Sequence, residues 1–150
     1  MNNLFPFQVI EESLEIAAPV ATVFERWTQF EKFPEFMEGV AEVKNLGDQE
    51  FYWRGEFAGQ MREWKSRVTV VIPSRRVAWR TTSSGAHSSR VVCVEGSSPE
   101  HTRVTVKMLI DPRDSWAQSP TPEQISQRVR ATLRRLKTIL ESQYGSRPQS

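Results

Sequence analysis

Cysteine and histidine are scarce in this sequence, and long apolar runs are absent. These shortages exclude an intrachain disulfide, a histidine metal site and a membrane-spanning helix. Cys93 is the only cysteine, so no intrachain disulfide can form, which suits a reducing compartment. The two histidines, His87 and His101, are too few and too badly spaced for a metal site. No apolar run approaches the roughly 20 residues that span a bilayer, and no basic segment precedes an apolar one at the N-terminus. We therefore expect a cytoplasmic protein without a metal, a signal peptide or a membrane span.

Phosphate-binding glycine loops are also missing. Neither GxGxxG nor GK[ST] occurs, and Gly39, Gly55 and Gly59 are isolated, so we expect no cofactor. The net charge of +2 is too small to indicate a nucleic-acid partner by itself. A length of 150 residues with 38% apolar and 25% charged residues is typical of one globular domain. We predict a single domain over residues 1–150, with a core at about 8–144 and a flexible tail at 145–150.

The main pattern in the sequence is the alternation of apolar and polar residues that is typical of β-strands. In residues 8–17, Ile10, Leu14 and Ile16 point to one side and mostly polar residues point to the other. The same period of two runs through residues 40–110, and strands joined by short turns pair as antiparallel hairpins. The predicted turns are Gly47-Asp48, Ala58-Gly59-Gln60, Pro73-Ser74, Ser83-Ser84-Gly85 and Gly96-Ser97-Ser98-Pro99. This pattern predicts an antiparallel sheet of about seven strands.

Helical spacing interrupts the alternation in three places. A short helix is predicted at residues 18–27, where Pro19 suits the first turn, and a second at residues 30–36, where Pro34 limits its extent. A long helix of about 22 residues begins after Thr121, a plausible N-cap. Its apolar stripe consists of Ile125, Val129, Leu133, Leu136 and Leu140.

The long helix has to bury its apolar stripe, and the concave face of the sheet is the one large apolar surface available. A strongly twisted sheet can grip a helix that lies across it. The sequence therefore predicts an α+β fold in which a curved antiparallel sheet wraps the C-terminal helix, with the two short helices after the first strand closing one end. The space between sheet and helix is a natural ligand pocket.

Candidate ligand contacts are the large side chains on the inward phases. Tryptophans in separate strands offer flat apolar faces with one N–H donor each, and the phenylalanines near residue 33 could cover the pocket mouth. Core packing without any ligand is the alternative interpretation of the same residues. The predicted ligand-binding set is Phe30, Phe33, Phe36, Met37, Trp53, Phe57, Trp64, Trp79, Thr81, Met108 and Leu133.

Candidate catalytic residues are few. Glu12 shares a face with apolar residues, and burial of such an acid would raise its pKa and suit proton transfer; an ion pair with an arginine is the alternative. His87 is a possible general base, and Ser66 points inward without an evident base. The inward polar set would be Glu12, Ser66, Thr81 and Arg90. No complete nucleophile–base–acid arrangement can be assembled from these residues.

The long helix also carries a basic stripe, formed by Arg128, Arg130, Arg134, Arg135 and Lys137. A solvated helix face is the simpler interpretation. The alternative is a docking surface for ribosome, RNA or an anionic membrane.

A set of ordered segments runs along nearly the whole chain, from about residue 8 to residue 142. These segments are Leu14-Glu15-Ile16-Ala17-Ala18-Pro19, Val23-Phe24, Phe30-Glu31-Lys32-Phe33-Pro34-Glu35-Phe36-Met37, Gly39-Val40, Val71-Ile72-Pro73-Ser74-Arg75-Arg76-Val77-Ala78-Trp79, Thr102-Arg103-Val104-Thr105-Val106 and Leu133-Arg134-Arg135-Leu136-Lys137. Together they resemble the polyketide cyclase/dehydrase family of the START-like (helix-grip, SRPBCC) superfamily. The resemblance implies a helix-grip fold and lipid-like or polyaromatic ligands, although a fold does not imply a reaction.

Three functions remain open from the sequence. The first is binding of a small hydrophobic ligand, such as a lipid, isoprenoid or polyketide-like molecule, in an internal cavity. The second is a cyclase or dehydratase, in which the cavity folds a flexible substrate and one acid or base moves protons. The third is macromolecular docking through the basic helix.

Overall fold

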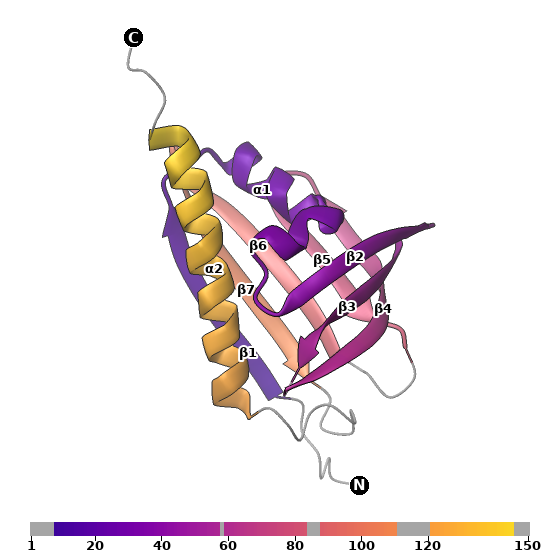
Figure 1. Cartoon of the computed structure of the whole chain (residues 1–150). Coiled ribbons are helices and arrows are strands. Elements are labelled where there is room, and N and C mark those ends of the chain that lie inside the picture. The colour runs from indigo at the N-terminus through magenta and orange to yellow at the C-terminus, as the bar shows by residue number, and fades with distance from the viewer. Residues whose placement is uncertain (1–7, 58, 84–87, 111–120, 146–150) are drawn as a thin grey trace, which may run out of the picture.

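The alternating residues form seven strands that hydrogen-bond into one antiparallel sheet (Figure 1). The computed structural model describes residues 8–57, 59–83, 88–110 and 121–145, except the side chains at 57, 144 and 145. The order across the sheet is β1-β7-β6-β5-β4-β3-β2, so β2 to β7 form a meander and β1 pairs with β7. The strands are β1 (Gln8–Ile16), β2 (Val40–Gly47), β3 (Glu50–Phe57), β4 (Gln60–Ile72), β5 (Arg76–Thr81), β6 (Ser88–Ser98) and β7 (His101–Ile110). The predicted α+β class and antiparallel sheet are confirmed.

Register shifts in several strands accompany the curvature of this sheet. The pairing shifts between Val40 and Glu42 in β2, between Val68 and Val70 in β4, and after Gly96 in β6. A bulge places an extra residue in one strand and increases the local right-handed twist. The sheet consequently has a concave face, which all the helices occupy (Figure 1).

Three helices cover the concave face: α1 (Val20–Thr28), the 3-10 helix η1 (Phe30–Glu35) and α2 (Pro122–Gly145). Helix α2 begins with a reciprocal cap, because Gln124 N donates to Thr121 Oγ1 at 3.2 Å and Thr121 N donates to Gln124 Oε1 at 2.9 Å. This pair satisfies backbone donors that a helix start leaves unpaired, and it confirms the predicted N-cap. No helix within the described ranges is long and apolar enough to span a membrane.

The C-terminal half of α2 packs tightly against the sheet. Leu133, Leu136 and Leu140 are each at most 1% exposed, so the apolar stripe read from the sequence faces the concave surface. On β7, alternate residues from Thr102 to Ile110 are buried, as period-two patterning requires. Together these surfaces form the main core and confirm that the sheet grips the helix.

Several predicted boundaries need correction. Pro19 is the N-cap of α1 with extended backbone (φ −63°, ψ 150°), rather than a residue of its first turn. Gly96 and Ser98 belong to β6, because a bulge lets the strand continue past the glycine. Strand β4 begins at Gln60, which had been expected in a turn, and α2 extends through Gly145, expected in the tail.

Glu141 ties the end of α2 to the chain that leaves β1. Its Oε2 accepts hydrogen bonds from Ala17 N at 2.8 Å and from Lys137 Nζ at 2.6 Å. Burial raises the pKa of this carboxyl, but the hydrogen bonds from Lys137 and Ala17 and the charge of Lys137 outweigh it, so the pKa lies below its ordinary value. The ionised carboxylate is therefore the form that holds the two elements together.

Replacing Glu141 with glutamine is expected to lower the free energy of unfolding by about 1 kcal/mol at neutral pH, because a charge-assisted hydrogen bond is lost. The depressed folded-state pKa means that this contribution is present above the unfolded pKa of a glutamate and is lost as the pH falls through the folded value. Urea unfolding at pH 7 and at about pH 3 should therefore show the gap between E141Q and wild type shrinking in acid. E25Q, on an exposed part of α1, is the control, and a gap that is equal at both pH values would contradict the role of the carboxylate.

Candidate ligand-binding site

Three tryptophans on adjacent strands form an apolar cluster of near-parallel rings on the concave face, the tryptophan platform. Trp53 of β3 lies directly opposite Trp64 of β4, and Trp79 follows on β5. The Trp53 ring centre is 5.8 Å from that of Trp64 and 6.1 Å from that of Trp79, with interplanar angles of 17° and 23°. Residues of the same phase on neighbouring strands project to the same face, which is why the rings meet.

Ser66 fixes the central ring of this platform. The Trp53 Nε1–H donates to Ser66 Oγ at 2.8 Å, and both residues are at most 1% exposed. A buried indole N–H requires such an acceptor. Ser66 was a weak catalytic candidate in the sequence; here its hydroxyl accepts a bond from the platform and does not line the cavity described below.

The phenylalanines of η1 anchor the short helix to the edge of the platform. Phe30 stacks on Phe51 with ring centres 4.5 Å apart and meets Trp79 edge-on at 5.0 Å. Phe33 lies 5.7 Å from both Trp53 and Trp79. These contacts make η1 a packed part of the core.

A cavity lies between the platform, the N-terminal half of α2 and the segment that leads into β2. Its volume, counted as the space that the centre of a water-sized molecule can occupy, is about 90 Å³. The apolar wall is formed by Trp27, Met37, Val40, Trp53, Trp64, Trp79, Val92, Val106, Met108, Ile110, Ile125 and Val129. Gly39 and the polar residues Glu38, Glu56, Thr81, Ser88, Arg90, Arg128 and Thr132 complete it.

The structure brings only part of the predicted ligand-binding set into this wall. The predicted residues in the wall are Met37, Trp53, Trp64, Trp79, Thr81 and Met108. Those buried outside the wall are Phe30, Phe33, Phe36 and Leu133. The phenylalanines lie elsewhere because they fill the contact between the short helices and the sheet, and Leu133 sits where α2 meets the sheet closely. The side chain of Phe57 lies outside the described part of the chain.

Arg90 places a positive charge in the cavity wall. It lies on β6, opposite Trp79 of β5 and Met108 of β7, and its Nη1 is 3.8 Å from Met37 Sδ. Burial, and to a smaller extent the nearby positive charge of Arg128, together lower the pKa of Arg90 to about 10. The guanidinium remains charged at neutral pH.

Arg128 bridges α2 to the other side of the cavity mouth. Its Nη1 donates to the backbone oxygen of Glu56 at 2.6 Å, and the same guanidinium passes over Gly39. A Cβ at Gly39 would lie 2.6 Å from Arg128 Nη1, and a Cβ at Gly55 would lie 2.6 Å from the Gly39 oxygen. The two glycines therefore allow the close approach of loop, strand and arginine that shapes the mouth.

The other catalytic candidates lie away from the cavity or cannot be placed. Glu12 is half-buried on β1 near Arg130, with 3.9 Å between its Oε1 and Arg130 Nε, which matches the ion-pair alternative. Glu12 does not line the cavity, and His87 lies outside the described residues. In the described ranges, no group of three or more His, Cys, Asp or Glu residues is placed to hold a metal ion.

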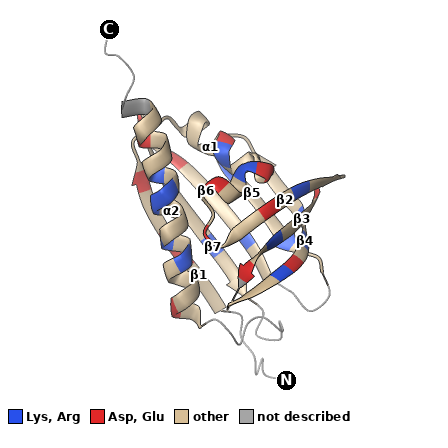
Figure 2. Cartoon of the chain, in the orientation of Figure 1, with Lys and Arg blue, Asp and Glu red and all other residues tan. Residues whose placement is uncertain are grey.

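The basic stripe of α2 is not one uniform exposed surface, although basic residues recur along the helix (Figure 2). Arg128 belongs to the cavity wall, which corrects its assignment to a solvated or docking face. Arg130 lies near Glu12 and Glu123, while Arg135 and Lys137 lie near Glu38 and Glu141. Helical spacing could not reveal this, because the partners come from distant parts of the chain.

Sequence reasoning missed the part of the wall that comes from the helices and from the segment before β2. Trp27 lies on the apolar face of α1, and its helical spacing identified it only as a core residue. Gly39 and Arg128 carried no local signal, since their contact joins residues far apart in the chain. Arg90 could be recognised from the sequence, because it is a charged residue at an inward-facing position of a strand.

The chain belongs to the family described as polyketide cyclase / dehydrase and lipid transport, which matches residues 16–136. The family and the helix-grip fold that the resemblance implied are therefore confirmed. An uncharacterized 17.2 kDa protein of Streptomyces lincolnensis is 37% identical over 103 residues, which cover 69% of each chain.

Solved structures share the fold. A START superfamily protein from Mycobacterium smegmatis superimposes with a TM-score of 0.70 at 15% identity, covering 90% of this chain and 95% of that chain. The ZhuI aromatase/cyclase from Streptomyces sp. R1128 has a TM-score of 0.62 at 18% identity, covering 88% and 87%. At these identities the likeness establishes the fold alone.

Replacing Gly39 with alanine is expected to destabilise the protein more than the same change at Gly59. Both glycines have positive φ, +83° and +79°, so an alanine at either position is strained to a similar degree. Only Gly39 has Arg128 where the new Cβ would lie. We expect G39A to cost about 1 kcal/mol more than G59A in urea unfolding, because the arginine must move. The excess should shrink when R128A is added, and equal losses for the two alanine variants would contradict the close contact.

Proposed function

We propose that this protein binds a small hydrophobic ligand in the cavity between the concave sheet and α2. The observation that carries the proposal is the set of near-parallel rings of Trp53, Trp64 and Trp79 beside a partly open cavity. A mostly apolar wall with a few polar groups is typical of small-molecule sites. The family description, which includes lipid transport, and the aromatase/cyclase among the structural relatives are consistent with an organic ligand.

The cavity volume limits the ligand. An engineered cavity of about 150 Å³ lined by apolar residues holds a benzene-sized molecule, and this one measures about 90 Å³. A ring-sized body already exceeds the described space. A bicyclic aromatic probe, like a longer lipid, isoprenoid or polyketide-like chain, would therefore need the segment around Gly39 and the start of α2 to move outward.

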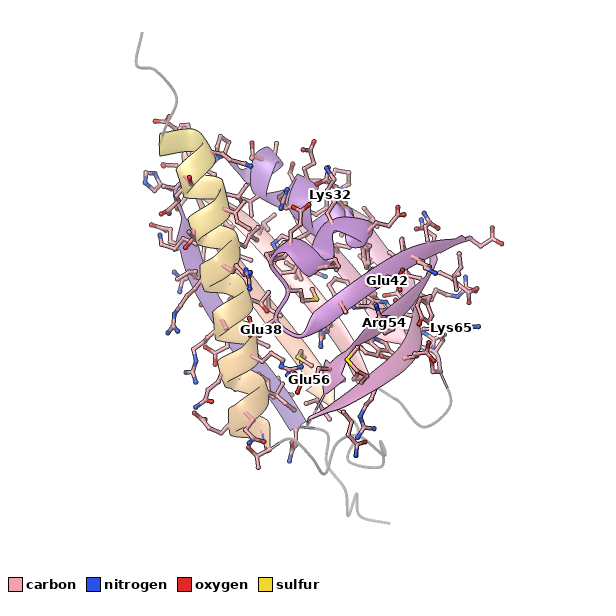
Figure 3. The ribbon with its side chains drawn as sticks, viewed as in Figure 1. Lys32, Glu38, Glu42, Arg54, Glu56 and Lys65 are labelled. Atoms are coloured by element: carbon pink, nitrogen blue, oxygen red, sulfur yellow. The ribbon has the colours of Figure 1, made fainter. Side chains whose placement is uncertain are left out.

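Binding is favoured over the cyclase or dehydratase alternative by the acids available. Among the described residues, the carboxylates of the cavity wall are those of Glu38 and Glu56, both exposed beside α2 (Figure 3). Glu38 Oε2 is also 3.8 Å from Arg135 Nη1. General acid–base catalysis needs a group within hydrogen-bond reach of the reacting atoms, and exposed carboxylates at the rim are poorly placed to serve a body on the platform. No observation favours docking to a ribosome, RNA or membrane.

A neutral flat probe, methyl 2-naphthoate, is expected to bind the purified protein, as measured by isothermal titration calorimetry. Replacing Met108 with tryptophan should weaken this binding by about tenfold or more, because the larger side chain fills the space that the probe needs. Leu109 is the matched control: it is the next residue of β7, is 39% exposed and does not line the cavity. L109W should bind the probe as wild type does.

Thermal melts of both variants are needed to show that each remains folded. Absence of binding to wild type, or equal weakening by M108W and L109W, would contradict the proposed site. Turnover of a substrate by wild type, lost together with the Glu38 or Glu56 carboxylate, would instead support the enzyme alternative.

A further inference from the structure

Arg90 is a poorly satisfied charge in an apolar wall. A guanidinium has five N–H donors and no acceptor. Among the described residues, the one hydrogen-bonding contact of Arg90 is the thioether of Met37, 3.8 Å away, which is a weak acceptor. Arg90 is half-buried. A partly desolvated charge without a charged partner is costly, so a fold that only needed to pack this position would be more stable with an apolar residue there.

Neither carboxylate of the wall compensates Arg90. No ion pair within 4 Å joins Arg90 to Glu38 or Glu56 in the part of the chain that the structure describes. Arg128, the second cation of the wall, donates to the backbone oxygen of Glu56, and its charge lowers the pKa of Arg90. Arg90 is therefore the charge of the wall to which an anion in the cavity would be drawn.

Trp27 also lines the cavity, but its indole nitrogen is not offered to a ligand. The Trp27 Nε1 atom is buried and has no hydrogen-bond partner among the described residues, and the same is true of Arg26 Nε, whose residue does not line the cavity. Arg90 is therefore the donor-only group of the wall on which recognition of an anion depends.

We propose that Arg90 binds an acidic oxygen of the ligand, so that the cavity takes a flat apolar carboxylate in preference to a neutral lipid. A carboxylate matches the fork of a guanidinium with two parallel hydrogen bonds, and it is a small anionic group that suits a small cavity. The flat body would lie against the tryptophan platform. This inference rests on the proposed ligand-binding function and names the chemical class of its ligand.

The test compares two probes of one shape by calorimetry at neutral pH: 2-naphthoate, which is an anion, and methyl 2-naphthoate, which is neutral. Wild type should bind the acid about tenfold more tightly than the ester, because a hydrogen-bonded charge pair forms only with the acid. R90Q should reduce this preference to about one, and R90K should retain part of it, because lysine keeps the charge but not the fork.

R134Q is the matched control, because Arg134 is exposed on α2 and the substitution changes the net charge by the same amount. It should leave the preference for the acid unchanged. Equal binding of acid and ester by wild type, or a preference that survives R90Q, would overturn the role of Arg90 while leaving the proposed function intact. Binding of neither probe would refute the proposed function itself.

Thermal unfolding without ligand gives a second, independent measurement. If Arg90 lacks a partner in the free protein, R90M should raise the melting temperature, by about 2–4 °C for a chain of this size. A fall in the melting temperature would show that the fold already satisfies the guanidinium, which would contradict the proposal. Adding 2-naphthoate should stabilise wild type more than R90M.

Discussion

The burial of the apolar stripe of α2 against a curved sheet is the interaction on which the rest of this structure depends. The contact differs along the helix. Leu133, Leu136 and Leu140 fill the space at the C-terminal half almost completely, while Ile125 and Val129 at the N-terminal half border a cavity. Protein interiors are close-packed and contain few voids. A cavity at one end of an otherwise tight helix–sheet contact is therefore unusual for a region that serves packing alone. One helix therefore supplies both the main stabilising contact and one wall of the candidate site.

Most buried donors of the interior have acceptors: Trp53 Nε1 donates to Ser66, and Thr102 Oγ1 donates to the backbone oxygen of Ala18. Among the described residues, two buried donors lack a partner, Trp27 Nε1 and Arg26 Nε, and only Trp27 belongs to a residue of the cavity wall. Unsatisfied donors therefore do not by themselves mark the cavity. Arg90 differs from both, because it is a half-buried charge that lines the cavity without a carboxylate beside it.

Much of the fold could be predicted from the sequence because its determinants are local and periodic. Period-two alternation identified the strands, and the shared phase of Trp53, Trp64 and Trp79 placed these residues on one face. Thr121 could be recognised as an N-cap because capping depends on the nearest residues. Boundaries such as the end of β6 were wrong where a bulge lets a strand continue past a residue typical of turns.

The cavity wall was harder to predict because it depends on contacts between distant segments. From the sequence, Phe30 and Phe33 could belong either to a lid over the pocket or to the core. Only the packing of η1 on the sheet places them in the core. Helical spacing put Arg128 with the exposed basic residues, although a glycine without a Cβ lets it cross to β3. A single sequence cannot supply such pairings.

The central claim, that a ligand occupies the space between the platform and α2, can be tested through the methionine methyl groups. Met37 and Met108 line the cavity, and Met61 is 55% exposed on β4 and does not. With 13C-methyl methionine and titration with 2-naphthoate, the account predicts saturable shifts of the Met37 and Met108 resonances while Met61 stays unchanged. Shifts confined to Met61, or no shift in any of these three methyl groups at saturating probe, would contradict it.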